Sequence, residues 1–185
     1  MPTFNPIASV SDLTALGVPA LTAQGLARMP AVPASYGHLA YCDGACSGNG
    51  QKTASPGGWG ALVTGADGSL LAGFFHESDT TNNRMELMAA ISALRALRPK
   101  ESVVLRTDSQ YVVKGCTEWR AGWQRRGMTN SKGEAVLNPD LWRLLWAEVD
   151  ARKVKFEWVR GHNGDPGNEI ADALAVLGAS GARRG

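Results

Sequence analysis

The sequence predicts an α/β fold in which one mixed five-stranded sheet carries helices on its faces. Three apolar segments joined by turns come first, a pattern typical of an antiparallel meander. Two later strand-like segments are each reached through a helical stretch, which indicates parallel additions by right-handed crossovers. The 185 residues, 44% hydrophobic and 19% charged, have the composition of a folded chain of about one domain.

The meander is predicted from short apolar runs that end at turn residues. The run at 39–42 ends at Asp43, and a second strand is expected over 57–64. Residues 66–68 are a hairpin signal, after which 69–77 returns as the third strand.

A helix and a fourth strand follow the meander. Apolar residues recur at helical spacing over 82–97, and Asn82 and Asn83 are its candidate N-caps. The β-branched run at 102–107 is expected to be a strand that ends at Asp108.

The second half of the chain is predicted to be mostly helical. Residues 109–127 are expected to form two helical pieces broken near Gly115, and Pro139 opens another helix at its first turn. Alternation of polar and apolar residues predicts a fifth strand over 153–159, and 168–177 forms a closing helix.

The first 35 residues differ from the rest. Residues 1–34 hold five of the nine prolines but only two charges, and 11–16 and 22–26 are candidates for short helical turns. We therefore predict an N-terminal arm over 1–35, poorly structured or docked, and a single domain over 36–185.

Composition excludes several classes of protein. The longest apolar runs are far too short for a membrane span, so no membrane partner is expected. Three cysteines are too few for a disulfide framework, and we interpret them as small buried hydrophobes. This agrees with a cytoplasmic protein. A net charge of +2 gives by itself no strong indication of a nucleic-acid partner.

Four carboxylates stand where an α/β fold concentrates function. Asp43 and Asp108 end strands that are expected to be parallel neighbours, while Glu86 and Asp172 have apolar or small neighbours on both sides. Converging carboxylates repel one another unless they share protons or bind a cation. Magnesium suits a site of few carboxylates and a substrate phosphate, and two such ions can clamp a phosphodiester.

Two further features have both an ordinary and a functional interpretation. His162 lies on a glycine-flanked loop, where it is either a surface residue or a group that transfers protons. Trp119 and Trp123 share a helical face among several arginines. They are either core residues or part of a nucleic-acid surface, and residues 115–160 carry nine basic and six acidic side chains.

Taken together, these motifs resemble bacterial ribonuclease HI, a type 1 ribonuclease H, over roughly residues 37–178. The segment at 81–90 followed by that at 107–112, in this order and spacing, is highly specific. The resemblance rests on YCDGAC at 41–46, TNNRMELMAA at 81–90, TDSQYV at 107–112, and Gly161-His162 with Asn168-Glu169 and Asp172.

The resemblance implies the ribonuclease H-like sheet order 3-2-1-4-5 and hydrolysis of the RNA strand in an RNA–DNA hybrid, leaving 5′-phosphate and 3′-hydroxyl ends. It implies two Mg²⁺ ions, with Mn²⁺ as a substitute, held by Asp43, Glu86, Asp108 and Asp172. Asp43 would bridge both ions, and Asp172 would hold the ion that activates water. His162 matches the mobile histidine of the family, which helps proton transfer or product departure.

The resemblance also implies substrate contacts. Asn49, Asn83 and Gln110 match residues that read the minor groove of the hybrid, where RNA displays its 2′-hydroxyls. Thr81 and Asn138 match a pocket for a phosphate of the DNA strand.

Trp119 and Trp123 match the basic protrusion that follows the DNA strand. Here the protrusion is less basic than is common in the family, so we predict a weaker grip on the hybrid and a shallower salt dependence of binding. The loop at 48–56 is longer than usual, which bears on the placement of Asn49.

Two alternatives remain: a non-catalytic module that binds hybrids, and a different nuclease of the same broad fold. The complete set of carboxylates speaks against the first, and the segment at 81–90 speaks against the second. The sequence therefore favours a monomeric, metal-dependent endoribonuclease.

Overall fold

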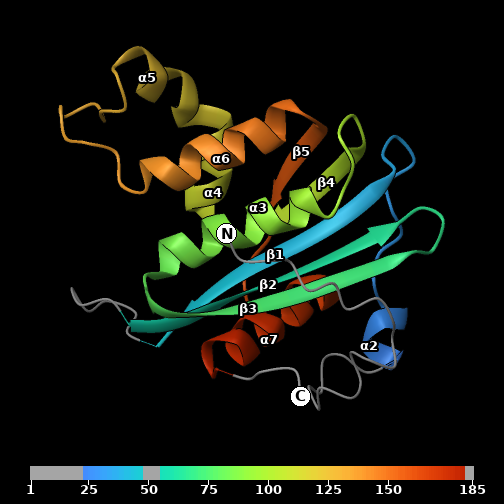
Figure 1. Cartoon of the computed structure of the whole chain (residues 1–185). Helices are drawn as coiled ribbons and strands as arrows, with labels where there is room; N and C mark the ends of the chain where they lie inside the picture. The colour runs from blue at the N-terminus through green and yellow to red at the C-terminus, as the bar shows by residue number, and fades with distance from the viewer. Residues whose placement is uncertain (1–22, 48–54, 182–185) are drawn as a thin grey trace.

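The computed structural model describes residues 23–47 and 55–181. Its centre is a five-stranded sheet with the order β3-β2-β1-β4-β5, so both the mixed sheet and the predicted strand order are confirmed (Figure 1). The first three strands pair antiparallel, whereas β4 and β5 add in parallel. The strands are β1 (His38–Cys46), β2 (Ser55–Gly65), β3 (Leu70–Thr80), β4 (Ser102–Thr107) and β5 (Lys153–Trp158).

Helices cover both faces of this sheet. On one face lie α3 (Asn82–Arg95) and α6 (Pro139–Asp150), and on the other lies α7 (Pro166–Ala179), with the short α2 (Ala23–Ala27) beside it (Figure 1). The predicted helical turn near residues 22–26 is therefore present as α2. The predicted turn at 11–16 lies outside the described residues.

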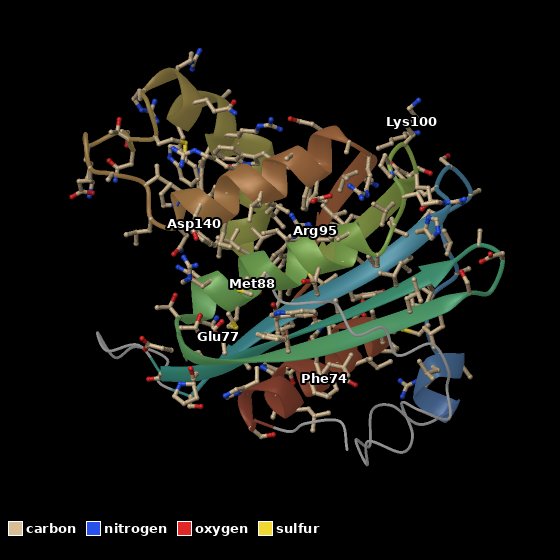
Figure 2. All side chains as sticks on the ribbon, in the orientation of Figure 1. Phe74, Glu77, Met88, Arg95, Lys100 and Asp140 are labelled. Atoms are coloured by element: carbon tan, nitrogen blue, oxygen red, sulfur yellow. The ribbon has the colours of Figure 1, made fainter. Side chains whose placement is uncertain are left out.

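The two faces bury cores of different size. The larger cluster fills the space under α3 and α6 and includes Leu94, Leu105 and Trp142. A smaller cluster under α7 contains Leu62 and Leu174, among others, and partly buried residues of the 23–36 segment and β3 pack against it. Figure 2 shows side chains filling both layers, with Met88 on α3 and Phe74 on β3. The division into an arm and a domain stays a prediction.

Two predicted helix boundaries are wrong. The N-cap of α3 is Thr81, whose side chain accepts from the Arg84 N–H, rather than Asn82 or Asn83. The helical stretch after β4 is not broken at Gly115. It runs without a gap through α4 (Gln110–Lys114), the π-helical η2 (Gly115–Trp119) and α5 (Arg120–Arg125).

The π-helical segment has a packing reason at Gly115. A Cβ at this position would overlap the Trp142 ring, so the glycine lets α6 approach closely. Its carbonyl accepts a hydrogen bond from the Trp146 indole at 3.3 Å. The glycine that resembles a helix breaker in the sequence therefore serves as a contact point between helices.

The predicted end of the first strand is also wrong. β1 does not stop before Asp43 but continues to Cys46, because its antiparallel ladder with β2 extends to the pair Cys46–Gly57. The parallel ladder with β4 ends earlier, at Tyr41–Arg106. Asp43 is therefore paired with β2 on one side of β1, but lies beyond the last pair with β4 on the other side.

Among the helices of the described residues, none is long and apolar enough to cross a membrane. The three cysteines are free; Cys42 is buried, and Cys46 and Cys116 are partly buried.

Candidate active site

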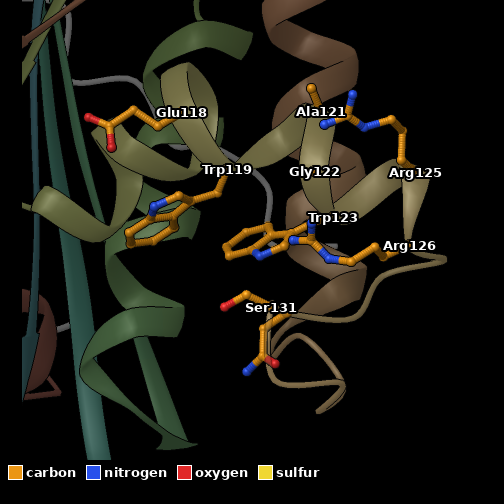
Figure 3. A pocket seen from close by; sticks show the side chains of 9 residues that line it. Glu118, Trp119, Ala121, Gly122, Trp123, Arg125, Arg126 and Ser131 are labelled. Atoms are coloured by element: carbon orange, nitrogen blue, oxygen red, sulfur yellow. The ribbon is translucent and has the colours of Figure 1, made fainter.

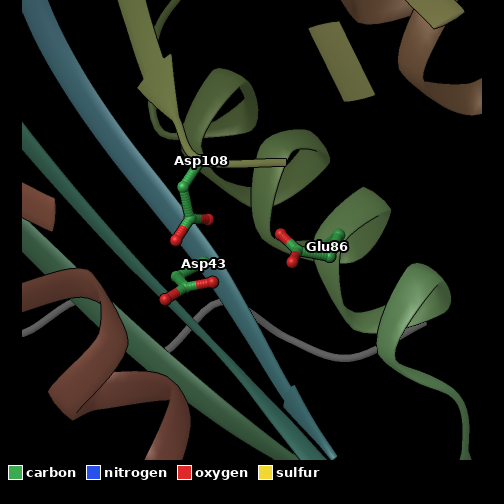
Figure 4. Close-up of side chains that lie close together, drawn as sticks. All are labelled: Asp43, Glu86 and Asp108. Carbon is green, nitrogen blue, oxygen red and sulfur yellow. The ribbon is translucent and has the colours of Figure 1, made fainter. Parts of the chain in front are cut away.

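Three of the predicted carboxylates converge at one edge of the sheet. Asp43 on β1, Glu86 on α3 and Asp108 directly after β4 each offer an oxygen, and these atoms lie within 4.8 Å of one another (Figure 4). Asp43 and Glu86 are only 6% exposed. The described residues thus contain a group of oxygen ligands with the density that a hard cation requires.

Strand register explains why the two aspartates meet. Tyr41 and Arg106 are the last partners of the parallel ladder, and each aspartate follows two residues later on its own strand. Because each aspartate lies two residues beyond the same pair, Asp43 and Asp108 lie side by side at the carboxyl ends of the two parallel strands.

Glu86 reaches this pair because α3 lies unusually close to β1. A Cβ on Gly44 would overlap the backbone of α3 at Met85 and Glu86, so the glycine after Asp43 permits the contact. The Asn82 side chain donates to Glu86 Oε1 at 3.3 Å. Asn82, expected only as a cap, therefore orients a carboxylate instead.

The cluster is electrostatically unfavourable by itself. Burial, followed by the charges of Asp108 and Asp172, raises the pKa of Asp43 to about 8. Burial, followed by the charges of Asp43 and Asp108, also raises the pKa of Glu86. Glu86 Oε2 is buried and has no hydrogen-bond partner among the described residues. Since buried polar groups are normally paired, these residues fit a bound divalent cation.

Asp172 and His162 stand at the border of this cluster. Asp172 is not one of the three closest carboxylates, but its charge contributes to the raised pKa of Asp43. Burial is the main cause that raises the pKa of Asp172 itself. His162 Nδ1 lies 3.9 Å from Asp172 Oδ2, its side chain is 80% exposed, and its φ is 51°. The structure therefore brings all five predicted catalytic residues to one edge.

The two residues of the predicted phosphate pocket are linked by a residue that sequence reasoning missed. Arg84 Nη1 donates to Asn138 Oδ1 at 3.3 Å, and the backbone N–H of Arg84 bonds to Thr81. Asp140 holds the guanidinium in an ion pair at 3.0 Å. The sequence feature that could have indicated Arg84 is its position three residues after the N-cap Thr81, which places this cation in the first turn of α3.

The remaining predicted contacts are distributed around the same edge. Asn83 is exposed on the first turn of α3, and Gln110 is exposed at the first residue of α4. Asn138 adopts a left-handed conformation directly before α6. Asn49 lies outside the described residues, so its prediction cannot be placed.

The two tryptophans of the protrusion differ in exposure. Trp123 is 9% exposed and packs edge-on against Trp142, with ring centroids 5.4 Å apart. Trp119 is only partly buried and lies 5.3 Å from Trp123. Both line a groove of about 450 Å³ that Arg125 and Arg126 also border (Figure 3). Trp123 therefore has a packing role, and nucleic-acid contact stays a prediction for both rings.

The chain has extensive similarity to known proteins. The family model for RNase H matches residues 37–180. Ribonuclease H of Bordetella avium is 50% identical over 145 residues, which cover 78% of this chain and 91% of the relative. Ribonuclease HI of Pseudomonas aeruginosa is 51% identical over 142 residues, 76% of this chain and 91% of the relative.

Solved structures agree with these sequence matches. LC9-RNase H1, a type 1 RNase H with the type 2 active-site motif, has a TM-score of 0.69 and 37% identity, and the match covers 84% of this chain and 75% of that one. The foamy viral protease-reverse transcriptase in complex with an RNA/DNA hybrid matches with a TM-score of 0.67 at 20% identity, over 80% of this chain and 20% of that one, which shows a shared fold alone. The family match and the half-identical bacterial relatives show that this chain belongs to the ribonuclease H family of nucleases.

Proposed function

We propose that this protein is an endoribonuclease that hydrolyses the RNA strand of RNA–DNA hybrids by two-metal-ion catalysis, leaving 5′-phosphate and 3′-hydroxyl ends. The observation that carries the proposal is the group of three carboxylates whose oxygens lie within 4.8 Å of one another. Membership of the ribonuclease H family supports the choice of substrate.

The cation site is formed by Asp43, Glu86 and Asp108, with Asp172 at its border. Oxygen-only ligands favour Mg²⁺, and Mn²⁺ accepts the same ligands. When bound, such ions supply positive charge that stabilises the attacking and leaving oxygens of a phosphodiester. The protein residues hold the acidic groups in place before the substrate arrives, because strand register and Gly44 fix their positions.

His162 is the residue that we propose to move a proton. Its Nδ1 faces Asp172 at 3.9 Å, which leaves Nε2 available to give or take a proton at the scissile phosphate. The exposed side chain on a loop can reach toward and away from the substrate. Asp172 orients the ring.

Recognition of the hybrid is assigned to the groups around the acidic edge. Asn83 and Gln110 are exposed amides that can donate and accept hydrogen bonds in the minor groove of the hybrid. Thr81, Arg84 and Asn138 form a polar group suited to a phosphate of the DNA strand.

Three labelled duplexes of one sequence test the proposal: an RNA–DNA hybrid, a double-stranded RNA and a double-stranded DNA, each incubated with Mg²⁺ or with EDTA. We expect cleavage of the RNA strand of the hybrid alone, and only with the divalent ion. The ends are checked by ligation, which requires a 5′-phosphate, and by primer extension, which requires a 3′-hydroxyl.

The same assay separates the alternatives. Binding of the hybrid without cleavage identifies a non-catalytic module. Cleavage of double-stranded DNA identifies a different nuclease of this fold. Either result contradicts the proposal.

A further inference from the structure

A row of polar side chains crosses the sheet directly before the acidic edge, on the face that α7 covers. Tyr41, Arg106 and Glu157 are register partners on β1, β4 and β5. Arg106 donates to the Tyr41 hydroxyl and to Glu157, each at 2.9 Å. Its guanidinium also lies 5.8 Å from the centre of the Tyr41 ring. One arginine thus ties three strands together two residues before Asp43 and Asp108.

Tyr41 connects this row to the first turn of α7. A Cβ on Gly167 would overlap the Tyr41 ring, so the helix rests directly on the ring. Asp165 caps α7 by accepting from the backbone N–H groups of Gly167 and Asn168, at 3.0 and 3.2 Å. Burial raises the pKa of Tyr41, and Asp165 raises it further by charge and by hydrogen bonding. Arg106 donates to the hydroxyl oxygen, so the hydroxyl holds its own proton and accepts from the guanidinium.

The contact between Tyr41 and α7 matters for the two site residues that the strands do not position, Asp172 and His162. Asp43 and Asp108 are held by strand register, and Glu86 by the close approach of α3. Asp172 instead arrives on α7, and His162 on the loop before it. Their distance from the other carboxylates depends on how the first turn of α7 sits on the sheet.

We propose that Tyr41 and Arg106 are positioning residues, which hold α7 and the preceding loop so that Asp172 and His162 meet the carboxylate cluster. The proposal rests on the proposed function, because it assigns both partners to the reaction. Tyr41 is fully buried and therefore acts through α7 rather than by touching the substrate. Small displacements of reacting groups reduce the reaction rate by large factors. Weaker support of α7 should therefore lower kcat more than it weakens binding of the hybrid.

Tyr41→Phe tests the proposal, since it removes the hydroxyl and keeps the ring under Gly167. We expect kcat for hybrid cleavage to fall about fivefold, whereas KM changes by less than about twofold. Tyr36→Phe is the matched control: the Tyr36 ring lies 5.0 Å from Lys153 Nζ, outside the row. Its kcat should equal that of the wild type. An unchanged kcat for Tyr41→Phe overturns the proposal.

A double-variant cycle distinguishes positioning from general loss of stability. If Tyr41 acts through the loop of His162, combining Tyr41→Phe with His162→Ala slows the reaction by clearly less than the product of the two single effects. A full product of the two effects shows independent action and contradicts the proposal.

Hydrogen exchange keeps this test separate from the proposed function. The backbone amides at 167–170 should exchange faster in Tyr41→Phe than in the wild type, while those of α3 stay unchanged. The measurement needs no substrate. A wild type that cleaves no hybrid refutes the proposed function but leaves this result valid, and unchanged exchange at 167–170 refutes the positioning role.

Discussion

Asp43 and Glu86 are buried side by side, and their pKa values are raised by burial and by neighbouring negative charge. In the protrusion, which we define as residues 110–137, the groups of like kind instead support one another. Trp123 packs on Trp142 and Trp146 of α6, and Arg120, whose guanidinium lies 5.4 Å from the centre of the Trp146 ring, pairs with Asp150 at 2.6 Å. One region therefore stores unfavourable electrostatics, while the other is stabilised by ring packing and an ion pair with α6.

The difference separates residues that act from residues that support. A group of buried carboxylates lowers the stability of the metal-free fold and is useful only when a cation compensates for it. An aromatic cluster stabilises the fold and places exposed arginines at its rim. Substitutions should accordingly affect activity in the first region and stability or binding in the second.

The largest expected effect is on catalysis in the carboxylate cluster. Asp108→Asn removes a charged ligand with little change in volume, and we expect cleavage of the hybrid to slow by about a hundredfold or more. Initial rates at saturating Mg²⁺ measure this. Asp150→Asn, on the exposed end of α6, is the matched control and should stay near the wild-type rate. Cutting by Asp108→Asn at the wild-type rate would refute its role.

In the protrusion, the largest effect should be on stability. Trp123→Ala removes a ring from the cluster and should lower the free energy of unfolding by about 3–4 kcal/mol. Trp119→Ala, at the more exposed neighbour, should cost about 1 kcal/mol. Denaturant titration of both variants gives the comparison. Equal losses would show that the two rings share one role.

In the carboxylate cluster, removing a side chain should raise the free energy of unfolding, whereas in the protrusion it lowers it. In metal-free protein, Asp43 has a folded pKa of about 8, above its value of 3.8 in the unfolded chain. Between these values the folded state holds a proton that the unfolded state lacks, so stability falls as pH rises toward 8.

Asp43→Asn removes that proton uptake. We expect it to raise the free energy of unfolding at pH 9 in EDTA by about 2 kcal/mol and to flatten the dependence on pH. Thermal unfolding between pH 5 and 9 measures both. Asp43→Asn that is less stable than the wild type at pH 9 would contradict the account of the cluster.

His162 is exposed, so its loss should be milder than that of a buried ligand. His162→Ala should slow cleavage about tenfold without abolishing it, because water can partly replace a proton shuttle. Stability should stay the same within error. Complete loss of cleavage would indicate a more central role than proton transfer.

The smallest effect is expected at the rim of the protrusion. Arg125→Gln should raise KM for the hybrid about threefold, leave kcat unchanged and reduce the slope of log affinity against log salt by about one. Arg143→Gln on α6 is the matched control for a charge outside the groove of the protrusion. Equal slopes for both variants would exclude a phosphate contact at Arg125. A wild-type slope as steep as that of a strongly basic relative would contradict the predicted weak grip.

Much of the fold and of the site follows from local sequence pattern. Alternation and helical spacing predicted the five strands and the main helices, and carboxylates at strand ends predicted Asp43 and Asp108 as neighbours. Boundaries were less predictable, because tertiary contacts decide them. Gly115 was expected to break a helix, but it accommodates the Trp142 ring. Likewise, β1 was expected to end at Asp43, but it continues along β2.

The distant partners of Arg84 and Arg106 could not be predicted from the sequence. Arg84 carries no local sign that it contacts Asn138, which is 54 residues away in sequence. The same holds for Arg106, whose partners lie on two other strands. A charged residue in a strand is ordinarily solvated, and only strand register shows that this one faces a tyrosine and a glutamate.

The sequence by itself determined the fold class, the strand order through its family resemblance, and the identity of the acidic residues, because periodicity and motif spacing are local properties of the chain. Only the tertiary structure decided that three carboxylates lie within 4.8 Å of one another, that one oxygen of Glu86 has no hydrogen-bond partner among the described residues, and that α7 rests on Tyr41. These features depend on burial and on distances between elements, which no single segment encodes.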